Sequence, residues 1–385
     1  MADGSLAAMA DHTLYKLNAT TGAVEAAVDI PTGDNPPEDS AFNGFSAFSD
    51  GTLVLKSLNR PVGCELNGYT AAAFLCPGAP ASANPSVLSV VDSRTWEVLD
   101  SVQGEENSIR RVSAVQFNGK NYAYFAGSEN VYRYEWDGMN ITPDESWGPV
   151  PYVKPGQTTA GALVLTDNFV LLSTNGNPTN VPMTVMAISH ANSSNVVSLD
   201  PFPLEPGQQS TYFAHGAFDP DNNLFYVMEA GPHKAAAINV DPQTGNMTVA
   251  WMVDQWSQSY ITLLGPADKR VFVNTNMASN VTQNWIELRP GPEGANYVEQ
   301  IQWRDATTGE LLAASDFFSP TAPAATVPVG YGGLIYNLLN TGQIMALQVS
   351  PQANTTSTNA APSPNSTSSP GSNLTSTTTT SGDGG

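Results

Sequence analysis

The chain has 385 residues, enough for one large or two ordinary domains, and its 14 Lys and Arg against 35 Asp and Glu give a net charge of −21. So few basic residues disfavour binding to nucleic acid through its phosphates, because that binding needs a clustered positive surface. No run approaches the ~18 uninterrupted apolar residues of a transmembrane helix, and the first residues lack the basic and apolar regions of a signal peptide.

A strand–turn–strand pattern recurs along the chain and predicts its fold. In the clearest copy, Asn239–Trp251, an apolar run enters the turn Asp241-Pro242-Gln243-Thr244-Gly245 and a second alternating run leaves it. Gly245 supplies a residue with positive φ, and Asp241 and Thr244 can bond to the turn backbone. Related hairpins span Leu14–Val28, Val87–Val102 and Gln300–Phe317, and degenerate copies span Val131–Thr142 and Met183–Leu199.

A second hairpin precedes each of these, with turns at 49–51, 118–120, 166–168, 219–223 and 266–268. Two successive hairpins form a four-stranded unit of roughly 45 to 65 residues, a period typical of propeller blades. Helical periodicity is nearly absent, and 29 Pro and 32 Gly interrupt almost every run. We therefore predict an all-β fold, a β-propeller, with a β-solenoid as the structural alternative. Its seven visible four-stranded blades are expected at 1–40, 41–106, 107–156, 157–209, 210–256, 257–325 and 326–351.

The first and last blades are incomplete in this prediction. Met1 aligns with the end of a missing innermost strand, so we expect a further N-terminal segment with room for an eighth blade and a signal peptide. Residues 1–351 are predicted to form the propeller. Residues 352–385 are rich in Ser, Thr and Asn and are predicted to be a disordered, O-glycosylated tail that would tether the protein to a surface. Small residues end the chain, but the hydrophobic tail of a GPI signal is absent.

Cysteines and glycosylation sequons favour an extracellular or cell-surface location. Cys64 and Cys76 are separated by 11 residues, and we favour a disulfide between them over two unpaired thiols. Long insertions (Asn59–Pro85, Asn175–Pro182 and Asn276–Asn296) are expected on one face, the loop-rich face, and tight turns on the other, the hairpin face. Glycans on the hairpin face would leave the loop-rich face free, although Asn is also simply common in turns. The sequons lie at Asn18, Asn140, Asn192, Asn246, Asn280, Asn354, Asn365 and Asn373.

Residues that begin successive blades are expected to point toward the mouth of the central channel. An Arg pair and a His there would receive a carboxylate or a sulfate, although His215 is also explained as a structural residue of a first strand. The candidate ligand-binding residues are Asn43, Arg110, Arg111, Thr159, His215, Trp256 and Tyr260.

Catalytic and metal motifs are absent from the sequence, and no catalytic residue is predicted. Asp219–Asn223 begins like a calcium loop but lacks its Gly and distal Glu, so a plain turn is favoured. The four His residues are scattered, and no metal site is expected. No cofactor is predicted, with calcium left open.

The turns Asp241–Gly245 and Asp305–Gly309 resemble those of the quinoprotein-like (PQQ-repeat) superfamily and of YVTN-type repeat propellers. This resemblance extends over most of residues 1–351 as a repeat rhythm. Quinoprotein membership would imply redox chemistry on a bound quinone with calcium. That family usually places a docking Trp four residues after the turn Gly, where this chain has Ala26, Val249 and Ala313.

We therefore expect a secreted or cell-surface β-propeller glycoprotein that acts as a binding or scaffold module through its loop-rich face. Its partner would be an extracellular protein, a glycan or a small anionic ligand. The alternative is a propeller enzyme, either a lactonase-like hydrolase or a quinoprotein-like oxidoreductase, with its site at the central channel.

Overall fold

The computed structural model describes twelve segments of the chain, and all structural statements below refer to them. They are residues 4–37, 40–59, 84–108, 110–159, 161–176, 178–211, 216–257, 259–279, 297–321, 327–328, 334–339 and 343–348. The predicted disulfide, one ligand-binding candidate and four sequons lie outside the described residues: Cys64, Cys76, His215, Asn280, Asn354, Asn365 and Asn373. No helix in the described segments is long and apolar enough to span a membrane.

The described residues form seven antiparallel sheets, numbered 1 to 7 here in chain order. Sheet 1 contains β1 (Leu6–Ala10), β2 (Thr13–Leu17) and β3 (Val24–Asp29). Sheet 2 contains β4 (Ser40–Ala47), β5 (Leu53–Asn59), β6 (Val87–Val91) and β7 (Val98–Gln103). Sheet 3 contains β8 (Ser113–Phe117), β9 (Lys120–Ala126), β10 (Asn130–Trp136) and β11 (Ile141–Pro143), with β12 (Val150–Pro151) also paired to β10.

The remaining sheets repeat the same meander of neighbouring strands. Sheet 4 contains β13 (Val164–Leu165), β14 (Phe169–Ser173), β15 (Val185–Ser189) and β16 (Val196–Leu199). Sheet 5 contains β17 (Ala217–Asp219), β18 (Leu224–Glu229), β19 (Lys234–Val240) and β20 (Met247–Asp254). Sheet 6 contains β21 (Thr262–Leu264), the 3₁₀ turn η3 (Ala267–Lys269), β22 (Val271–Ser279), β23 (Tyr297–Asp305) and β24 (Leu311–Ala314). Sheet 7 contains β25 (Leu334–Leu338) and β26 (Ile344–Gln348).

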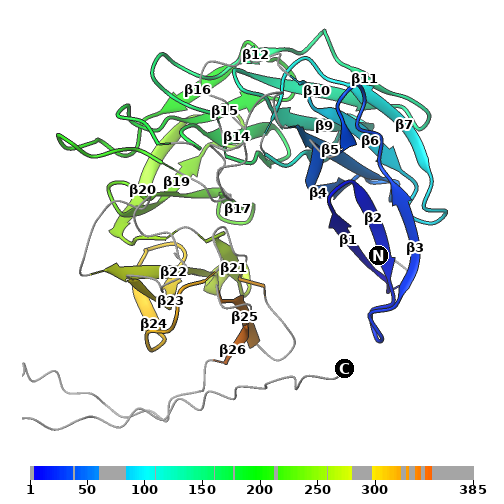
Figure 1. Cartoon of the computed structure of the whole chain (residues 1–385). Coiled ribbons are helices and arrows are strands. Elements are labelled where there is room, and N and C mark those ends of the chain that lie inside the picture. Colours follow the sequence, from blue (N-terminus) through cyan, green and yellow to red (C-terminus); the bar gives the residue numbers. More distant parts are fainter. Residues whose placement is uncertain are drawn as a thin grey trace, which may run out of the picture.

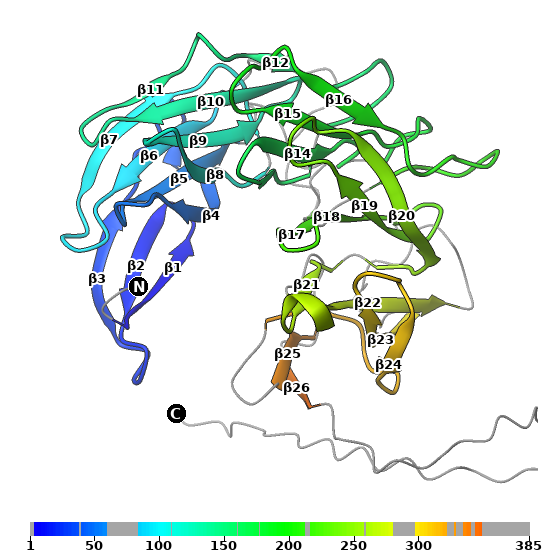
Figure 2. The ribbon, with the colours of Figure 1, turned by 180° about the vertical axis from the view of Figure 1, so that it is seen from behind.

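The sheets follow one another around an open ring, with sheets 1 and 7 at its two ends (Figures 1 and 2). The innermost strands of adjacent sheets touch, as in the pairs β1–β4, β4–β8, β8–β13 and β17–β21. Outer strands touch as well, as in the pairs β7–β11 and β16–β20. Each sheet therefore packs its face against the next one, and the buried clusters lie between sheets rather than in one central core. Strands such as β18, buried along their whole length, read as continuous apolar runs for this reason.

The recurring turn has the geometry that its sequence predicts. Asp241 Oδ1 accepts hydrogen bonds from the backbone N–H groups of Gln243 and Thr244 at 2.9 and 2.8 Å, and Gly245 has a φ of 73°. The turns at Asn18 and Asp305 repeat these bonds, with Gly22 and Gly309 in the left-handed position. In the β6–β7 turn Trp96 takes this position, with a φ of 64°.

Tryptophans join neighbouring sheets. The Trp96 indole is buried and donates a hydrogen bond to the carbonyl of Leu14 in sheet 1, at 3.0 Å, which offsets the strain of its left-handed backbone. Trp251 of sheet 5 donates to the carbonyl of Ala306 in sheet 6, at 2.8 Å, and its ring packs against Gly309. The quinoprotein-like resemblance implies a docking Trp at position 249, where this chain has Val249. The tryptophan that contacts sheet 6 is Trp251, two residues later. A bulge between β19 and β20 lies beside it and resets the alternation of the strand.

Candidate functional site

On the loop-rich face, the structure brings two of the predicted residues together from distant parts of the chain. Arg111 lies in the connection between sheets 2 and 3, and Tyr260 lies in the connection between sheets 5 and 6. The Arg111 guanidinium carbon is 5.5 Å from the centre of the Tyr260 ring, a cation–π contact. Both side chains are half-buried. Gly44 of β4 makes room for the Arg111 side chain, because an added Cβ there would lie 3.1 Å from its Cδ and Nε atoms.

The neighbouring Arg110 reaches a third element of this face. Its Nη2 atom donates a hydrogen bond to the carbonyl of Gly176, at 3.1 Å, in the connection between β14 and β15. This connection is the predicted insertion 175–182, and its geometry is fixed by Asn175, whose amide donates to Val181 and to Ser210. The arginine pair therefore links sheets 2, 3, 4 and 6 on one face.

The other predicted ligand-binding residues are less accessible or lie outside what the structure describes. Thr159 and Trp256 are both buried, with 8% and 6% of their surface exposed. The Trp256 ring stacks on His233, with ring centres 4.1 Å apart and planes 16° apart. The backbone of Asn43 belongs to β4, but its side chain is outside the described part, as is all of His215.

Buried charged residues on this face were missed by the sequence reasoning. Lys56 is fully buried in β5, and its ammonium donates hydrogen bonds to the carbonyls of Ser57 and Ser108, at 2.7 and 2.6 Å. Burial lowers the pKa of Lys56 to about 7. Ser108 lies two residues before Arg110, so Lys56 positions the segment that carries the arginine pair. A single charged residue inside the apolar run Leu53–Leu58 is the signal that could have revealed it.

Two carboxyl groups are buried in a similar way. Glu229 ends β18 and accepts hydrogen bonds from the hydroxyl of Ser210 and the backbone N–H of Thr211, both at 2.6 Å. Glu299 in β23 accepts a bond from the backbone N–H of Thr321, at 3.1 Å. Burial raises the pKa of each carboxyl to about 7. These acids hold chain connections in place, and in the described residues no group of three or more His, Cys, Asp or Glu side chains could hold a metal ion.

The partial calcium motif at 219–223 is a turn closed by an arginine. Asp219 is fully buried, and its Oδ2 atom lies 3.2 Å from Nε of Arg270, which also pairs with Asp221. Asn222 donates a further bond to Asp219, at 2.8 Å. A guanidinium thus neutralises the two carboxylates that a calcium ion would otherwise bridge.

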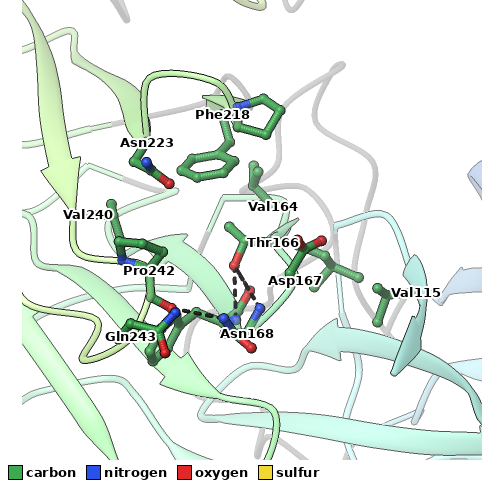
Figure 3. A pocket seen from close by; sticks show the side chains of 13 residues that line it. Val115, Val164, Thr166, Asp167, Asn168, Phe218, Asn223, Val240, Pro242 and Gln243 are labelled. Carbon is green, nitrogen blue, oxygen red and sulfur yellow. Dashed lines mark hydrogen bonds between the residues drawn. The ribbon is translucent and has the colours of Figure 1, made fainter. Parts of the chain in front are cut away.

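A pocket of about 510 Å³ opens on the hairpin face, between sheets 4 and 5. Its walls come from the turns β13–β14, β17–β18 and β19–β20 and from Val115 of β8. Figure 3 shows Phe218 and Asn223 on one side of it and Asn168 and Gln243 on the other. The Asn168 amide donates a hydrogen bond to the carbonyl of Pro242, at 2.9 Å, and so ties two of these turns together. The sequence identified the turns but could not place turns of different sheets beside one another.

Comparisons with solved structures identify the fold. BamB from Moraxella catarrhalis is similar with a TM-score of 0.51 and 12% identity, over 90% of this chain and 82% of that one. The Cps50 (Swd1) β-propeller domain of Myceliophteria thermophila gives 0.52 and 10%, over 90% and 93%. A chain of a mitotic checkpoint complex gives 0.51 and 12%, over 90% and 84%. The protein is a β-propeller. No family model and no curated protein sequence matches it.

The distant resemblance to β-propellers is confirmed at the level of the fold. Identities of 10 to 12% carry the architecture but not a reaction or a ligand. The all-β prediction is also confirmed, since the described residues contain no α-helix. The glycosylation sites, the disulfide and the extracellular location stay predictions.

Proposed function

We propose that this propeller is an extracellular or cell-surface binding module that receives an acidic ligand on its loop-rich face. The observation that carries the proposal is Arg111, held over the Tyr260 ring by Gly44 and by the connection that Lys56 fixes. Within the described residues the Arg111 guanidinium has neither a carboxylate nor a hydrogen-bond partner. Its N–H donors are therefore available to a carboxylate or a sulfate of an extracellular protein, a glycan or a small anion.

The position of the sequons supports the extracellular part of the proposal. Asn140, Asn192 and Asn246 are exposed and lie in turns between the third and fourth strands of their sheets, and the half-buried Asn18 lies in the β2–β3 turn between the last two strands of sheet 1. These turns belong to the hairpin face, opposite the arginine pair. Glycans attached to these asparagines would cover the hairpin face and leave the loop-rich face accessible to a partner.

Binding of acidic probes to the full chain tests the ligand class. A hexaglutamate peptide and a sulfated disaccharide are titrated by calorimetry, and we expect at least one to bind in a salt-dependent manner. Arg111→Gln should weaken that binding at least tenfold, about 1.4 kcal/mol. Arg94→Gln is the matched control, because Arg94 is exposed on the hairpin face and pairs only with Asp92 among the described residues. Absence of binding to both probes, or an equal loss with Arg94→Gln, would overturn the proposed ligand class.

Mass spectrometry of protein from its native source tests the compartment. We expect sugar on Asn18, Asn140, Asn192 or Asn246 and a bridge between Cys64 and Cys76. Bare asparagines at all four positions together with free thiols would contradict an extracellular location.

A further inference from the structure

The pocket on the hairpin face plays no part in the function proposed above. It lies on the hairpin face, and three of its lining residues, Val115, Val164 and Phe218, belong to the first strands of sheets 3, 4 and 5. Its volume of about 510 Å³ falls in the range of small-molecule sites, roughly 300 to 1,000 Å³. The pocket is thus large enough for a small-molecule ligand, and residues of three sheets form its wall.

Flat apolar surfaces make up part of the wall. Phe218 belongs to β17, Pro220 lies in the β17–β18 turn that follows it, and Pro242 lies in the β19–β20 turn. The two turns are joined by a hydrogen bond from the backbone N–H of Val240 to the carbonyl of Asn223, at 2.9 Å. The face of an aromatic ring carries partial negative charge and attracts the weakly positive hydrogens of C–H groups. These surfaces suit a ligand with C–H groups on a broad face.

The polar groups of the pocket have unused hydrogen-bonding capacity. The side chains of Asp167, Asn223 and Gln243 make no hydrogen bond within the part of the chain that the structure describes. In Figure 3, Asn223 and Gln243 lie on two sides of the pocket, and Thr166 and Asp167 lie between them. An amide both donates and accepts, and a carboxylate accepts, so the three side chains together can pair with several hydroxyl groups.

The charges in the pocket narrow the ligand class. Its lining contains one carboxylate, Asp167, and no Lys, Arg or His. An anion would therefore meet repulsion without a compensating base. A quaternary ammonium ion would need several aromatic faces around it. Of the two rings in the lining, Phe218 is half-buried and Phe169 is fully buried beneath Gly245.

We propose that this pocket binds a neutral sugar, the terminal one or two rings of an oligosaccharide. The C–H face of the sugar packs on Phe218 and the two prolines. Its hydroxyl groups donate to Asp167 and exchange hydrogen bonds with the amides of Asn223 and Gln243. Sugar rings have one apolar face and a hydroxyl-rich edge, and the pocket offers a surface for each.

Binding of neutral disaccharides to the full chain tests this site. Lactose, maltose, cellobiose and chitobiose are screened by saturation-transfer NMR and calorimetry, with glucuronate and choline as charged probes. At least one neutral sugar should bind, and Asp167→Ala and Gln243→Ala should each weaken it at least fivefold. Asp268→Ala is the matched control, because Asp268 is an exposed carboxylate in the corresponding turn of sheet 6. Melting temperatures of all variants establish that each one is folded.

Each outcome decides the proposal. Failure of all four sugars at millimolar concentration, stronger binding of glucuronate or choline, or an equal effect of Asp268→Ala would overturn it. The preferred disaccharide attached to a carrier protein separates two sources of the ligand. Equal binding indicates a soluble sugar, and binding of the attached form alone indicates a glycan on a partner. Arg111→Gln should leave sugar binding unchanged, so this test is independent of the function proposed for the loop-rich face.

Discussion

The Lys56 ammonium donates a hydrogen bond to the carbonyl of Ser108, and this bond connects a fully buried charge in β5 to the segment that ends in the arginine pair. The same segment is fixed by Asn107, which exchanges bonds with Asn59, and by Glu106, which accepts bonds from Glu129 and Tyr132. A buried polar network thus holds a half-buried cation at the surface. Burial of the Lys56 charge costs free energy of folding, but its bond to Ser108 positions Arg110 and Arg111.

Replacing Lys56 by Met should separate stability from binding. The folded-state pKa of about 7 lies below the unfolded value of 10.5, so the unfolded chain binds more protons between these pH values and stability rises with pH across that window. Lys56→Met should abolish this rise, which melting curves between pH 6 and 10 would measure. At pH 6 the variant should melt at an equal or higher temperature, yet bind the acidic ligand several-fold more weakly. A rise with pH that persists in the variant would contradict this account.

Glu229 should give the opposite pH dependence. Its folded-state pKa of about 7 lies above the unfolded value of 4.5, so the folded chain binds more protons in this window. The contribution of Glu229 to stability is complete below pH 4.5 and is lost as the pH rises through 7. Glu229→Gln should flatten the fall in melting temperature between pH 4.5 and 7 and stabilise the protein at pH 8. Glu310→Gln, at an exposed turn position, is the control and should leave the profile unchanged.

The turns explain why the fold was predictable from the sequence. Asp241-x-x-Thr244-Gly245 and its relatives act through bonds within a few residues, so the local sequence specifies them and their repetition reveals the sheets. The pocket and the Arg111–Tyr260 contact join residues of different sheets, and their formation depends on how the sheets pack. The order of the predicted strands puts Arg111 and Tyr260 on the same face. It does not predict that the Arg111 side chain packs against Gly44, where a larger residue would crowd it. Nothing in the sequence distinguishes Phe218 and Gln243, which line the pocket, from ordinary residues of a hairpin.

The stability of the propeller should depend on Arg270 and not on a bound metal ion at Asp219. Asp219 is fully buried, so Arg270→Ala would leave an unpaired carboxylate and should cost about 3 to 5 kcal/mol of unfolding free energy. Urea denaturation measures this loss. Dialysis of the wild-type protein against a chelator should leave its urea midpoint unchanged, because the guanidinium already neutralises Asp219 and Asp221. A lower midpoint after chelation would instead point to a calcium ion that stabilises the propeller.

The packing of Trp251 on Gly309 can be measured with a matched pair of glycines. Gly309 and Gly22 occupy the same turn position with φ values of 76° and 70°, so Ala at either site meets similar backbone strain. An added Cβ at Gly309 would lie 2.8 Å from the Trp251 ring, whereas Gly22 has no atom within 4 Å. Gly309→Ala should therefore destabilise the protein by ~1 to 3 kcal/mol more than Gly22→Ala.

A double-mutant cycle with Trp251→Phe separates the ring contact from the hydrogen bond. Trp251→Phe removes the indole donor and leaves the Ala306 carbonyl with the Tyr226 hydroxyl, at 3.2 Å, as its remaining side-chain partner, at a cost of about 0.5 to 1.5 kcal/mol. The smaller ring also makes room for a Cβ at position 309, so the two substitutions together should cost less than the sum of their separate effects. Additive effects, or equal losses for Gly309→Ala and Gly22→Ala, would mean that the sheets are not held together through this glycine. The turn glycine would then matter for its backbone conformation alone.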